Sequence, residues 1–283
     1  MPVFRKIKDD FKKLKSKLFA DKRIGVIKIE GIILDSGPLS FASKVLESFE
    51  RAKKLEIKTI LLRINSPGGT VGASQEIYRE IKKAQAEGMK VIASLGDVAA
   101  SGGIYVAAGA DKIVSNPGTV TGSIGVIIKT NVVKELYKKI GLDSQVVKSG
   151  EYKDILSSTK YLSEEEKAIL QELIDSAYGQ FVEVVAENRK IDVEEVKKFA
   201  DGRIFSGVQA KELGLVDELG SQSDAVDLAA KLAGIEGKPD LVDLSPPKSF
   251  LQKVTGANIS ETLENMGISS IQKRTPLWLM PDC

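Results

Sequence analysis

The sequence has no histidine and a single cysteine, Cys283, among its 283 residues. Without histidine, the chain cannot build a Ser-His-Asp or Cys-His catalytic system or a histidine-ligated zinc or iron site. One cysteine excludes an intramolecular disulfide and a multi-cysteine metal cluster. We expect neither a metal nor a cofactor, so any hydrolytic chemistry must take its base from lysine, aspartate, glutamate or a partner molecule.

The chain also has little net charge, because 41 Lys and Arg are set against 39 Asp and Glu, which gives +2. This balance gives no whole-protein case for nucleic-acid binding, and we expect no nucleic-acid partner. The charges are unevenly distributed, since residues 1–23 hold nine basic residues and three aspartates. That segment therefore carries +6, on a remainder of about −4.

Residues 1–23 also have the spacing of an amphipathic helix. A basic amphipathic helix can lie on an anionic membrane surface, and the alternative is a solvated helix that packs on the body or on a neighbouring subunit. No apolar region with a small-residue cleavage site marks a secretory signal. The apolar stripe consists of Phe4, Ile7, Phe11, Leu14 and Leu18.

One apolar stretch, residues 91–110, is long enough to span a membrane and carries a single charge, Asp97. It also contains four glycines and lacks flanking aromatic residues, which favours a buried strand, turn and helix over a membrane span. We therefore expect no transmembrane helix in this part of the chain.

Strand-like and helix-like patterns alternate along the body, which predicts an α/β fold with a mainly parallel sheet. Ser163 and Glu166 form a capping-box pattern at the start of a long helix. We divide the chain into a basic N-terminal segment (1–23), one domain (24–237) and a C-terminal tail (238–283). The expected strands are 24–29, 59–64, 90–94, 112–115 and 144–148, with a further apolar run at 123–128. The expected helices are 42–54, 71–86, 131–140, 163–188, 193–199 and 221–232.

Two glycine-rich turns follow expected strands. The turn at residues 65–69 (Asn-Ser-Pro-Gly-Gly) points backbone N–H groups outward at a helix start, which suits an oxyanion or a phosphate, and a purely structural turn is the alternative. The turn at residues 99–103 places Ser101 between small residues. Ser101 is either a nucleophile or a helix N-cap, and no G-x-S-x-G elbow is present.

Taken together and in order, these motifs resemble the signal peptide peptidase A family (protease IV), and the resemblance extends from about Ile24 to Leu232. The motifs that carry it are Asn65-Ser66-Pro67-Gly68-Gly69, Ser101-Gly102-Gly103, Thr121-Gly122-Ser123, Ser149-Gly150-Glu151-Tyr152-Lys153-Asp154, Asp201-Gly202-Arg203 and Leu215-Val216-Asp217-Glu218-Leu219-Gly220.

The resemblance implies a Clp-protease/crotonase-type fold of repeated ββα units that wind into a spiral. It implies that Ser101 is the nucleophile and Lys153 the general base. It also implies that the N–H groups of Gly68 and Gly102 form the oxyanion hole, and that Ser123 orients the lysine. A lysine is almost wholly protonated at neutral pH, but burial in an apolar pocket disfavours the ammonium form, so a lysine can replace the missing histidine.

The implied function is a serine endopeptidase that cleaves apolar peptides, such as residual signal peptides, through a Ser-Lys dyad and an acyl-enzyme. Short members of the family form ring-shaped homo-oligomers and build each site across neighbouring subunits, so the dyad of Ser101 and Lys153 is expected within or between chains. Asp154 could act as a catalytic acid, but we expect it to form ion pairs elsewhere. One hypothesis for the tail is that its apolar end occupies the substrate groove of its own or a neighbouring subunit.

Members of that family usually carry a membrane-spanning anchor, whereas here a short basic segment precedes the first expected strand. We therefore expect membrane association that is peripheral or through residues 1–23, with the membrane face left open. Two other functions remain. A crotonase-like acyl-CoA enzyme would need a CoA-phosphate site and an acidic acid/base residue, and neither is apparent. A catalytically silent membrane-associated scaffold would not need Ser101, Lys153, Gly68 and Ser123 together.

Overall fold

The computed structural model describes residues 22–35, 40–246 and 277–279, so most of the predicted basic segment lies outside the described residues. Strands and helices alternate through the body, as the sequence predicts. The strands are β1 (Arg23–Glu30), β2 (Thr59–Ser66), β3 (Gly68–Thr70), β4 (Lys90–Ala100), β5 (Lys112–Ser115), β6 (Val120–Gly122), β7 (Ile204–Ser206), β8 (Glu218–Leu219), β9 (Asp240–Asp243) and β10 (Leu277–Leu279). The helices are α2 (Phe41–Lys54), α3 (Val71–Ala86), α4 (Gly102–Ala108), α5 (Lys134–Lys139), α6 (Glu164–Arg189), α7 (Val193–Lys197), α8 (Gly207–Glu212) and α9 (Gln222–Ala233).

Eight of the described strands form one sheet, in the order β7-β6-β4-β2-β1-β9, with β5 beside β4 and β8 beside β5. Its pairs are parallel except for β6 with β7. The mainly parallel α/β sheet predicted from the sequence is therefore confirmed. The sheet also extends past the predicted domain end at residue 237, because β9 pairs with β1.

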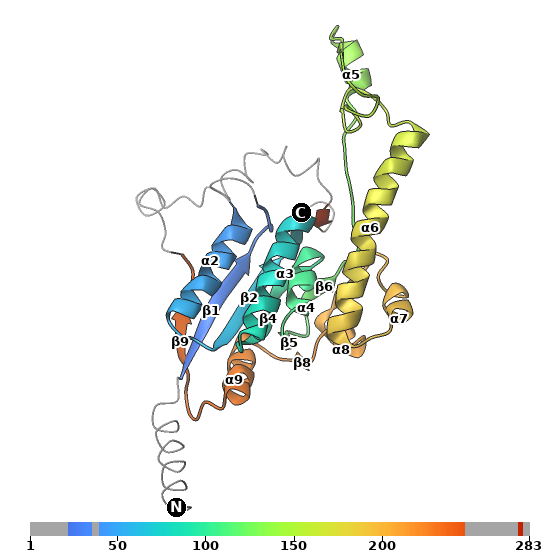
Figure 1. Ribbon diagram of the computed structural model, residues 1–283. Coiled ribbons are helices and arrows are strands. Elements are labelled where there is room, and N and C mark those ends of the chain that lie inside the picture. The colour runs from blue at the N-terminus through green and yellow to red at the C-terminus, as the bar shows by residue number, and fades with distance from the viewer. Residues whose placement is uncertain (1–21, 36–39, 247–276, 280–283) are drawn as a thin grey trace, which may run out of the picture.

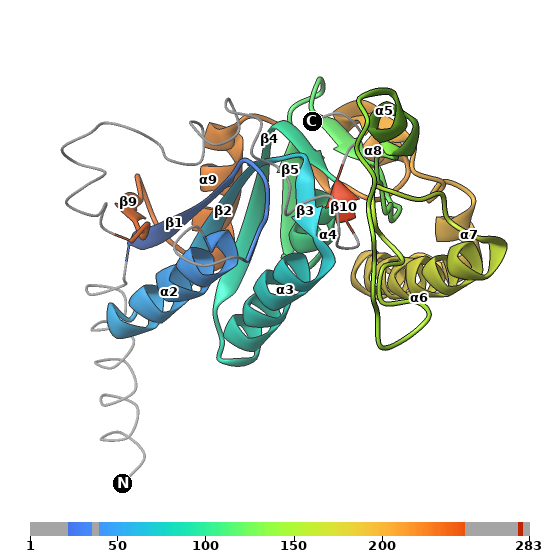
Figure 2. The ribbon, with the colours of Figure 1, turned by 90° about the horizontal axis from the view of Figure 1, so that it is seen from above.

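Both faces of the sheet are covered, as Figure 2 shows, with α2 and α3 on one side and α9 on the other. Side chains alternate between the faces along each strand. In β1, Ile27 and Ile29 join the core under α2 and α3, whereas Ile24 and Val26 pack with Ala225 and other residues of α9. A strand covered on both sides is apolar at nearly every position, which explains the continuous β-branched runs of the sequence.

Strand β4 carries the chain to the candidate site and is longer than the predicted strand 90–94. Its first half pairs with β5 and its last three residues pair with β6, so the sheet divides along β4. The hydroxyl of Thr121 donates to the carbonyl of Ala99 at 2.6 Å, and that of Thr119 donates to Gly96 at 2.6 Å. These buried bonds hold β6 against the end of β4, directly before Ser101.

Residues 129–163, which we call the arm, extend away from the sheet past the N-terminal end of α6 (Figure 1). The expected helix 131–140 is confirmed only at α5, and the expected strand 144–148 is wrong, since this stretch has no regular structure. The reason is that a strand needs a paired neighbour and a buried face. Here the side chain of Val147 is fully exposed, and that of Val146 is 51% exposed.

Helix α6 joins the arm to the body. The predicted capping box at its start is confirmed, because Ser163 and Glu166 each bond the other's backbone N–H. Toward its C-terminal end, Phe181, Val182 and Val185 are buried in the main core. Within the ranges described, none of the helices combines the length and the apolar character needed to cross a membrane.

The described part of the C-terminal tail contributes one more strand. Residues 277–279 (β10) pair antiparallel with β3, with Trp278 opposite Gly69 and Leu279 opposite Gly68. The apolar end of the tail thus pairs with the glycine-rich turn of its own chain that the sequence singled out.

Candidate active site

Ser101 occupies the turn between β4 and α4, with a φ of 52° and a ψ of −117°. A non-glycine residue in this conformation costs about 1–3 kcal/mol and persists only where its surroundings hold it. Here the Ser101 N–H donates to the carbonyl of Gly122 at 2.8 Å, and the Ser101 carbonyl accepts from the Tyr105 N–H at 3.0 Å. The turn is a sharp strand-to-helix elbow, although the sequence lacks the usual elbow motif.

The hydroxyl of Ser101 is buried, with the residue 1% exposed, yet it has no hydrogen-bond partner in the described part of the chain. Ser101 stands at the N-cap position of α4, as one of the two interpretations of the sequence expects, but its side chain makes no capping hydrogen bond. A buried hydroxyl without a partner costs about 1–3 kcal/mol of stability. Folding therefore leaves the Ser101 hydroxyl without a hydrogen bond from the described residues, at a cost in stability. The hydroxyl is thus free to bond a group from another molecule.

Glycines bring the two predicted turns into contact. A Cβ placed on Gly102 would lie 2.6 Å from the Ser74 Oγ and 3.2 Å from the Cα of Gly68. A Cβ on Gly103 would lie 2.8 Å from the carbonyl oxygen of Ser66. Any larger residue would push the start of α4 away from the turn, so the glycines are what place the Gly102 backbone beside Gly68.

Gly68 has a φ of +112°, and its N–H donates to the Oγ of Ser66 at 3.1 Å. Its carbonyl accepts from the Ile33 N–H at 2.8 Å, and Thr70 donates back to the Ile33 carbonyl at 2.9 Å. The predicted oxyanion donor therefore makes a local hydrogen bond. Because successive peptide groups of a strand face opposite edges, the N–H and carbonyl of Gly69 face the edge that β10 covers.

Ser123 lies next to the turn that holds Ser101. Ala100 of β4 pairs with Gly122 of β6 in a parallel ladder. Ser101 and Ser123 come directly after these two residues, so they leave neighbouring strands at the same level. Ser123 is 5% exposed, has a φ of 51°, and donates its N–H to the carbonyl of Arg203 at 2.8 Å. One chain thus brings Ser101, Ser123 and the two glycines predicted to form the oxyanion hole together.

Lys153 is not part of this group. It lies on the arm and is exposed, and its side chain makes no hydrogen bond or ion pair with any described residue. Figure 1 shows the arm beyond the end of α6, away from α4 and the sheet. The base predicted from the family motif is therefore separated from Ser101 within a single chain.

Asp154 forms ion pairs, as expected, with Lys148 at 2.8 Å and Lys160 at 2.9 Å. Hydrogen bonds from the two ammonium groups lower the pKa of Asp154 to about 2, so it is ionised at neutral pH and unsuited to donate a proton. The sequence did not predict the role of Lys160, nor its second ion pair, which it forms with Glu166. The capping box pointed to Glu166, but it gave no sign that the same carboxylate also holds the arm.

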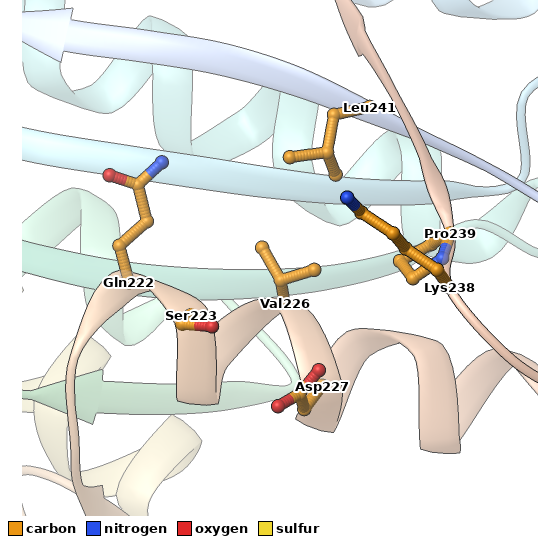
Figure 3. Close-up of a pocket in the computed structure, with 7 residues that line it drawn as sticks. All are labelled: Gln222, Ser223, Val226, Asp227, Lys238, Pro239 and Leu241. Carbon is orange, nitrogen blue, oxygen red and sulfur yellow. The ribbon is translucent and has the colours of Figure 1, made fainter.

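A separate pocket of about 340 Å³ lies between α9 and the segment leading into β9, on the opposite face of the sheet from α3 (Figure 3). In the close-up, Val226 projects from α9 toward Leu241, and Lys238 borders the opening. The pocket contains none of the predicted site residues, and we assign it no catalytic role.

Comparison with known proteins places this arrangement in a family. The profile of peptidase family S49 matches residues 83–236, and the profile of the NfeD1b N-terminal domain matches residues 26–139. Among solved structures, a ClpP1 variant from Listeria monocytogenes superimposes with a TM-score of 0.50 at 21% identity, covering 74% of this chain and 98% of that one. The Clp-protease-type fold expected from the sequence is thereby confirmed.

Several relatives are similar over most of this chain. The protein slr0021 of Synechocystis sp., described as a candidate protease, is 46% identical over 272 residues, which cover 91% of this chain and 96% of that protein. Protease 4 of Salmonella typhi is 40% identical and covers 75% of this chain, but this chain spans only 35% of its length. A signal peptide peptidase homologue of Enterococcus faecium is 40% identical over 75% of this chain and 64% of its own. The chain belongs to peptidase family S49.

Proposed function

We propose that this protein is a serine endopeptidase that cleaves extended apolar peptides, including residual signal peptides, with Ser101 as nucleophile and Lys153 as general base. The observation that carries the proposal is the Ser101 hydroxyl, which is buried, unpartnered and held on a strained turn beside the backbone of Gly68 and Gly102. The names of the Enterococcus and Salmonella relatives support peptidase chemistry and the signal-peptide substrate class.

In this mechanism, the Oγ of Ser101 attacks the scissile carbonyl carbon while the Nζ of Lys153 accepts its proton. The N–H groups of Gly102 and Gly68 bind the tetrahedral oxyanion, the latter after exchanging its bond to Ser66 for the substrate oxygen. The C–N bond then breaks as the lysine returns the proton to the leaving amine. Water, deprotonated by the same lysine, hydrolyses the acyl-enzyme and frees Ser101.

The substrate binds by strand addition to β3. The pairing of β10 with β3 supports this, because an extended segment of sequence Leu-Trp-Leu covers that edge with antiparallel polarity. In this direction, the peptide runs toward Gly68 as it approaches its own C-terminal side. The residues on the N-terminal side of the scissile bond would therefore lie along β3, and the reacting carbonyl would lie near Gly68 and Ser101.

The base is supplied by a neighbouring copy of the chain in a ring-shaped homo-oligomer. Two observations support the packing of a second copy against the arm: the Ser101 hydroxyl lacks a hydrogen-bond partner among the described residues, and the arm exposes several large apolar side chains. An apolar surface of this kind typically marks an interaction site. The large apolar side chains exposed on the arm are Leu136, Ile140, Leu142, Val146, Val147, Tyr152 and Tyr161.

Subunit mixing tests both the dyad and its location. Ser101→Ala and Lys153→Ala should each abolish cleavage of an apolar reporter peptide without altering the circular dichroism spectrum. If neighbouring chains share each site, unfolding and refolding the two inactive variants together should restore about a quarter of the wild-type activity, because random assembly pairs an intact serine with an intact lysine at that frequency. Activity in either single variant would refute the dyad, and a mixture without activity would refute sharing between chains.

We also propose that the enzyme associates with a membrane surface through residues 1–23. That segment carries a net charge of +6 and leads into β1. One pocket on that side of the body is lined by three basic residues. They are Arg23 at the start of β1, Lys58 just before β2 and Lys90 at the start of β4. Binding to vesicles that contain phosphatidylglycerol, but not to neutral vesicles, should follow and should weaken as salt is raised. Equal binding to both vesicle types would contradict the proposal.

A further inference from the structure

The arm is held to the body by a chain of charged side chains. Lys148 and Lys160 both donate to the same oxygen of Asp154, at 2.8 and 2.9 Å. Lys160 also donates to Glu166 in the first turn of α6. The chain therefore runs from the residues before Lys153, through Asp154 directly after it, to the helix that enters the core.

Glu166 makes the connection rigid. It is 4% exposed, and its second carboxylate oxygen accepts from the Ser163 N–H at 3.0 Å, while the Ser163 Oγ accepts from the Glu166 N–H at 3.2 Å. One oxygen thus caps α6 and the other holds Lys160. A carboxylate in the first turn is further stabilised by the positive end of a helix, and α6 has 26 residues.

The three lysines of this stretch differ in a way that matters for chemistry. Lys148 and Lys160 are paired with carboxylates, whereas Lys153 between them makes no ion pair with any described residue. A carboxylate next to an ammonium group stabilises its protonated form, which is unsuited to act as a base. Because Lys148 and Lys160 both pair with Asp154, the charge of this carboxylate is balanced without Lys153. Both ion pairs are partly buried.

We propose that Asp154, Lys160 and Glu166 are positioning residues for Lys153, which fasten the backbone on its C-terminal side to α6 and keep its neighbouring carboxylate occupied. The inference rests on the proposed function, in which Lys153 is the base. A base displaced by about 1 Å can cost about 100-fold in rate, so loss of the network should act on turnover. The lysines of these ion pairs are 26–32% exposed, and such pairs contribute little to folding, so the same loss should change stability far less than turnover.

Two variants separate these effects. Glu166→Gln removes the charge that holds Lys160 but keeps the capping box, since glutamine serves equally at that position. Lys160→Met breaks both ion pairs, and Lys160→Arg preserves the charge. The matched control is Lys167→Met, which removes an exposed ion pair with Glu164 in the same turns of α6.

The measurement is steady-state cleavage of an apolar reporter peptide by the full chain, with melting temperature and oligomer size recorded for every variant. Glu166→Gln and Lys160→Met should lower kcat by about 10- to 100-fold with KM within about twofold, and Lys160→Arg should recover most of the activity. Melting temperature and size should stay close to wild type, and Lys167→Met should behave as wild type.

Wild-type kcat in Glu166→Gln and Lys160→Met would overturn the inference. A loss of activity that follows a lower melting temperature or a smaller oligomer would overturn it too, because the network would then serve folding or assembly. Lys153→Ala, assayed in parallel, distinguishes the two levels. If Lys153→Ala is inactive while Lys160→Met is fully active, only the positioning role fails, whereas an active Lys153→Ala refutes the proposed function itself.

Discussion

The turn that holds Ser101 and the arm that carries Lys153 are built in opposite ways. Around Ser101, the backbone is buried, hydrogen-bonded on both sides and packed against glycines that leave no room for a side chain. Lys153 lies exposed, on an arm that is held by ion pairs and carries exposed apolar side chains. Folding of one chain therefore completes the environment of Ser101, whereas in the function we propose Lys153 obtains its environment from a neighbouring copy of the chain.

The largest effect on the buried side of this comparison should come from Gly102→Ala. The new Cβ would lie 2.6 Å from the Oγ of Ser74 and 3.2 Å from the Cα of Gly68, so the two oxyanion donors that we propose must move apart. We expect kcat/KM to fall by about 100- to 1,000-fold, the cost of losing one oxyanion-hole donor. Gly72→Ala in α3, where a Cβ meets nothing within 4 Å, is the matched control and should stay active. Comparable activities of the two variants would mean that this close approach is not needed for catalysis.

On the exposed side, Val147→Glu should break assembly while leaving the fold intact. Val147 is fully exposed in the single chain, so a charge there costs nothing until a second copy buries it. We expect dissociation to single chains in light scattering and at least a tenfold loss of activity, with unchanged circular dichroism. Leu232→Glu, on α9 and 41% exposed, should keep the oligomer and the activity. If the Val147→Glu variant still forms the oligomer, the arm is not part of the interface between subunits.

A smaller effect should follow from deleting residues 277–283, which removes β10 from the edge of β3. If substrate and tail compete for this edge, the deletion removes an intramolecular competitor, and we expect KM to fall by about two- to tenfold with kcat unchanged. Deleting only residues 281–283 leaves β10 in place and should have no such effect. An unchanged or higher KM in the longer deletion would show that substrate binds elsewhere.

The sequence predicts the buried side of the molecule well, for a physical reason. Strands covered on both faces must be apolar along their whole length, so the starts of β1, β2 and β4 and the bounds of α3 could be predicted to within a residue. The turns at residues 65–69 and 99–103 were recognisable from their glycines. Their contact was not, because it depends on how β4 divides between β5 and β6.

The arm was predicted less well because its pattern gives the wrong signal. The residues of 144–148 have the composition of a strand, yet nothing in the described chain pairs with them, and they form none. Lys153 was identified only through the family motif, since no local pattern separates it from the other lysines. The network through Lys160 and Glu166 could not be predicted either, because ion pairs between a loop and a helix leave no periodic trace in a sequence.

The smallest expected effect comes from a comparison of two aspartates, Asp217 in the body and Asp154 on the arm. Asp217 in the body pairs with Arg189 at 3.0 Å and Lys112 at 2.9 Å, and although burial raises its pKa, these bonds bring the net value below the usual range. Asp217→Asn leaves the largely buried Arg189 without its carboxylate and should cost about 1–3 kcal/mol of unfolding free energy near neutral pH.

The pH dependence of that cost follows from the direction of the shift. Because the pKa of Asp217 is lower in the folded than in the unfolded chain, its contribution is complete above the unfolded value of about 3.9 and is lost as the pH falls through the folded value. Urea unfolding at pH 6, 4 and 3 should therefore show the gap between wild type and Asp217→Asn closing as the pH falls. Asp154→Asn on the arm should show a smaller gap at pH 6 while losing activity, since its lysine partners are 26–32% exposed whereas Arg189, the partner of Asp217, is 9% exposed. Equal destabilisation by the two variants would mean that the arm is as much a part of the folded core as the body, and the contrast between the two halves of the site would fail.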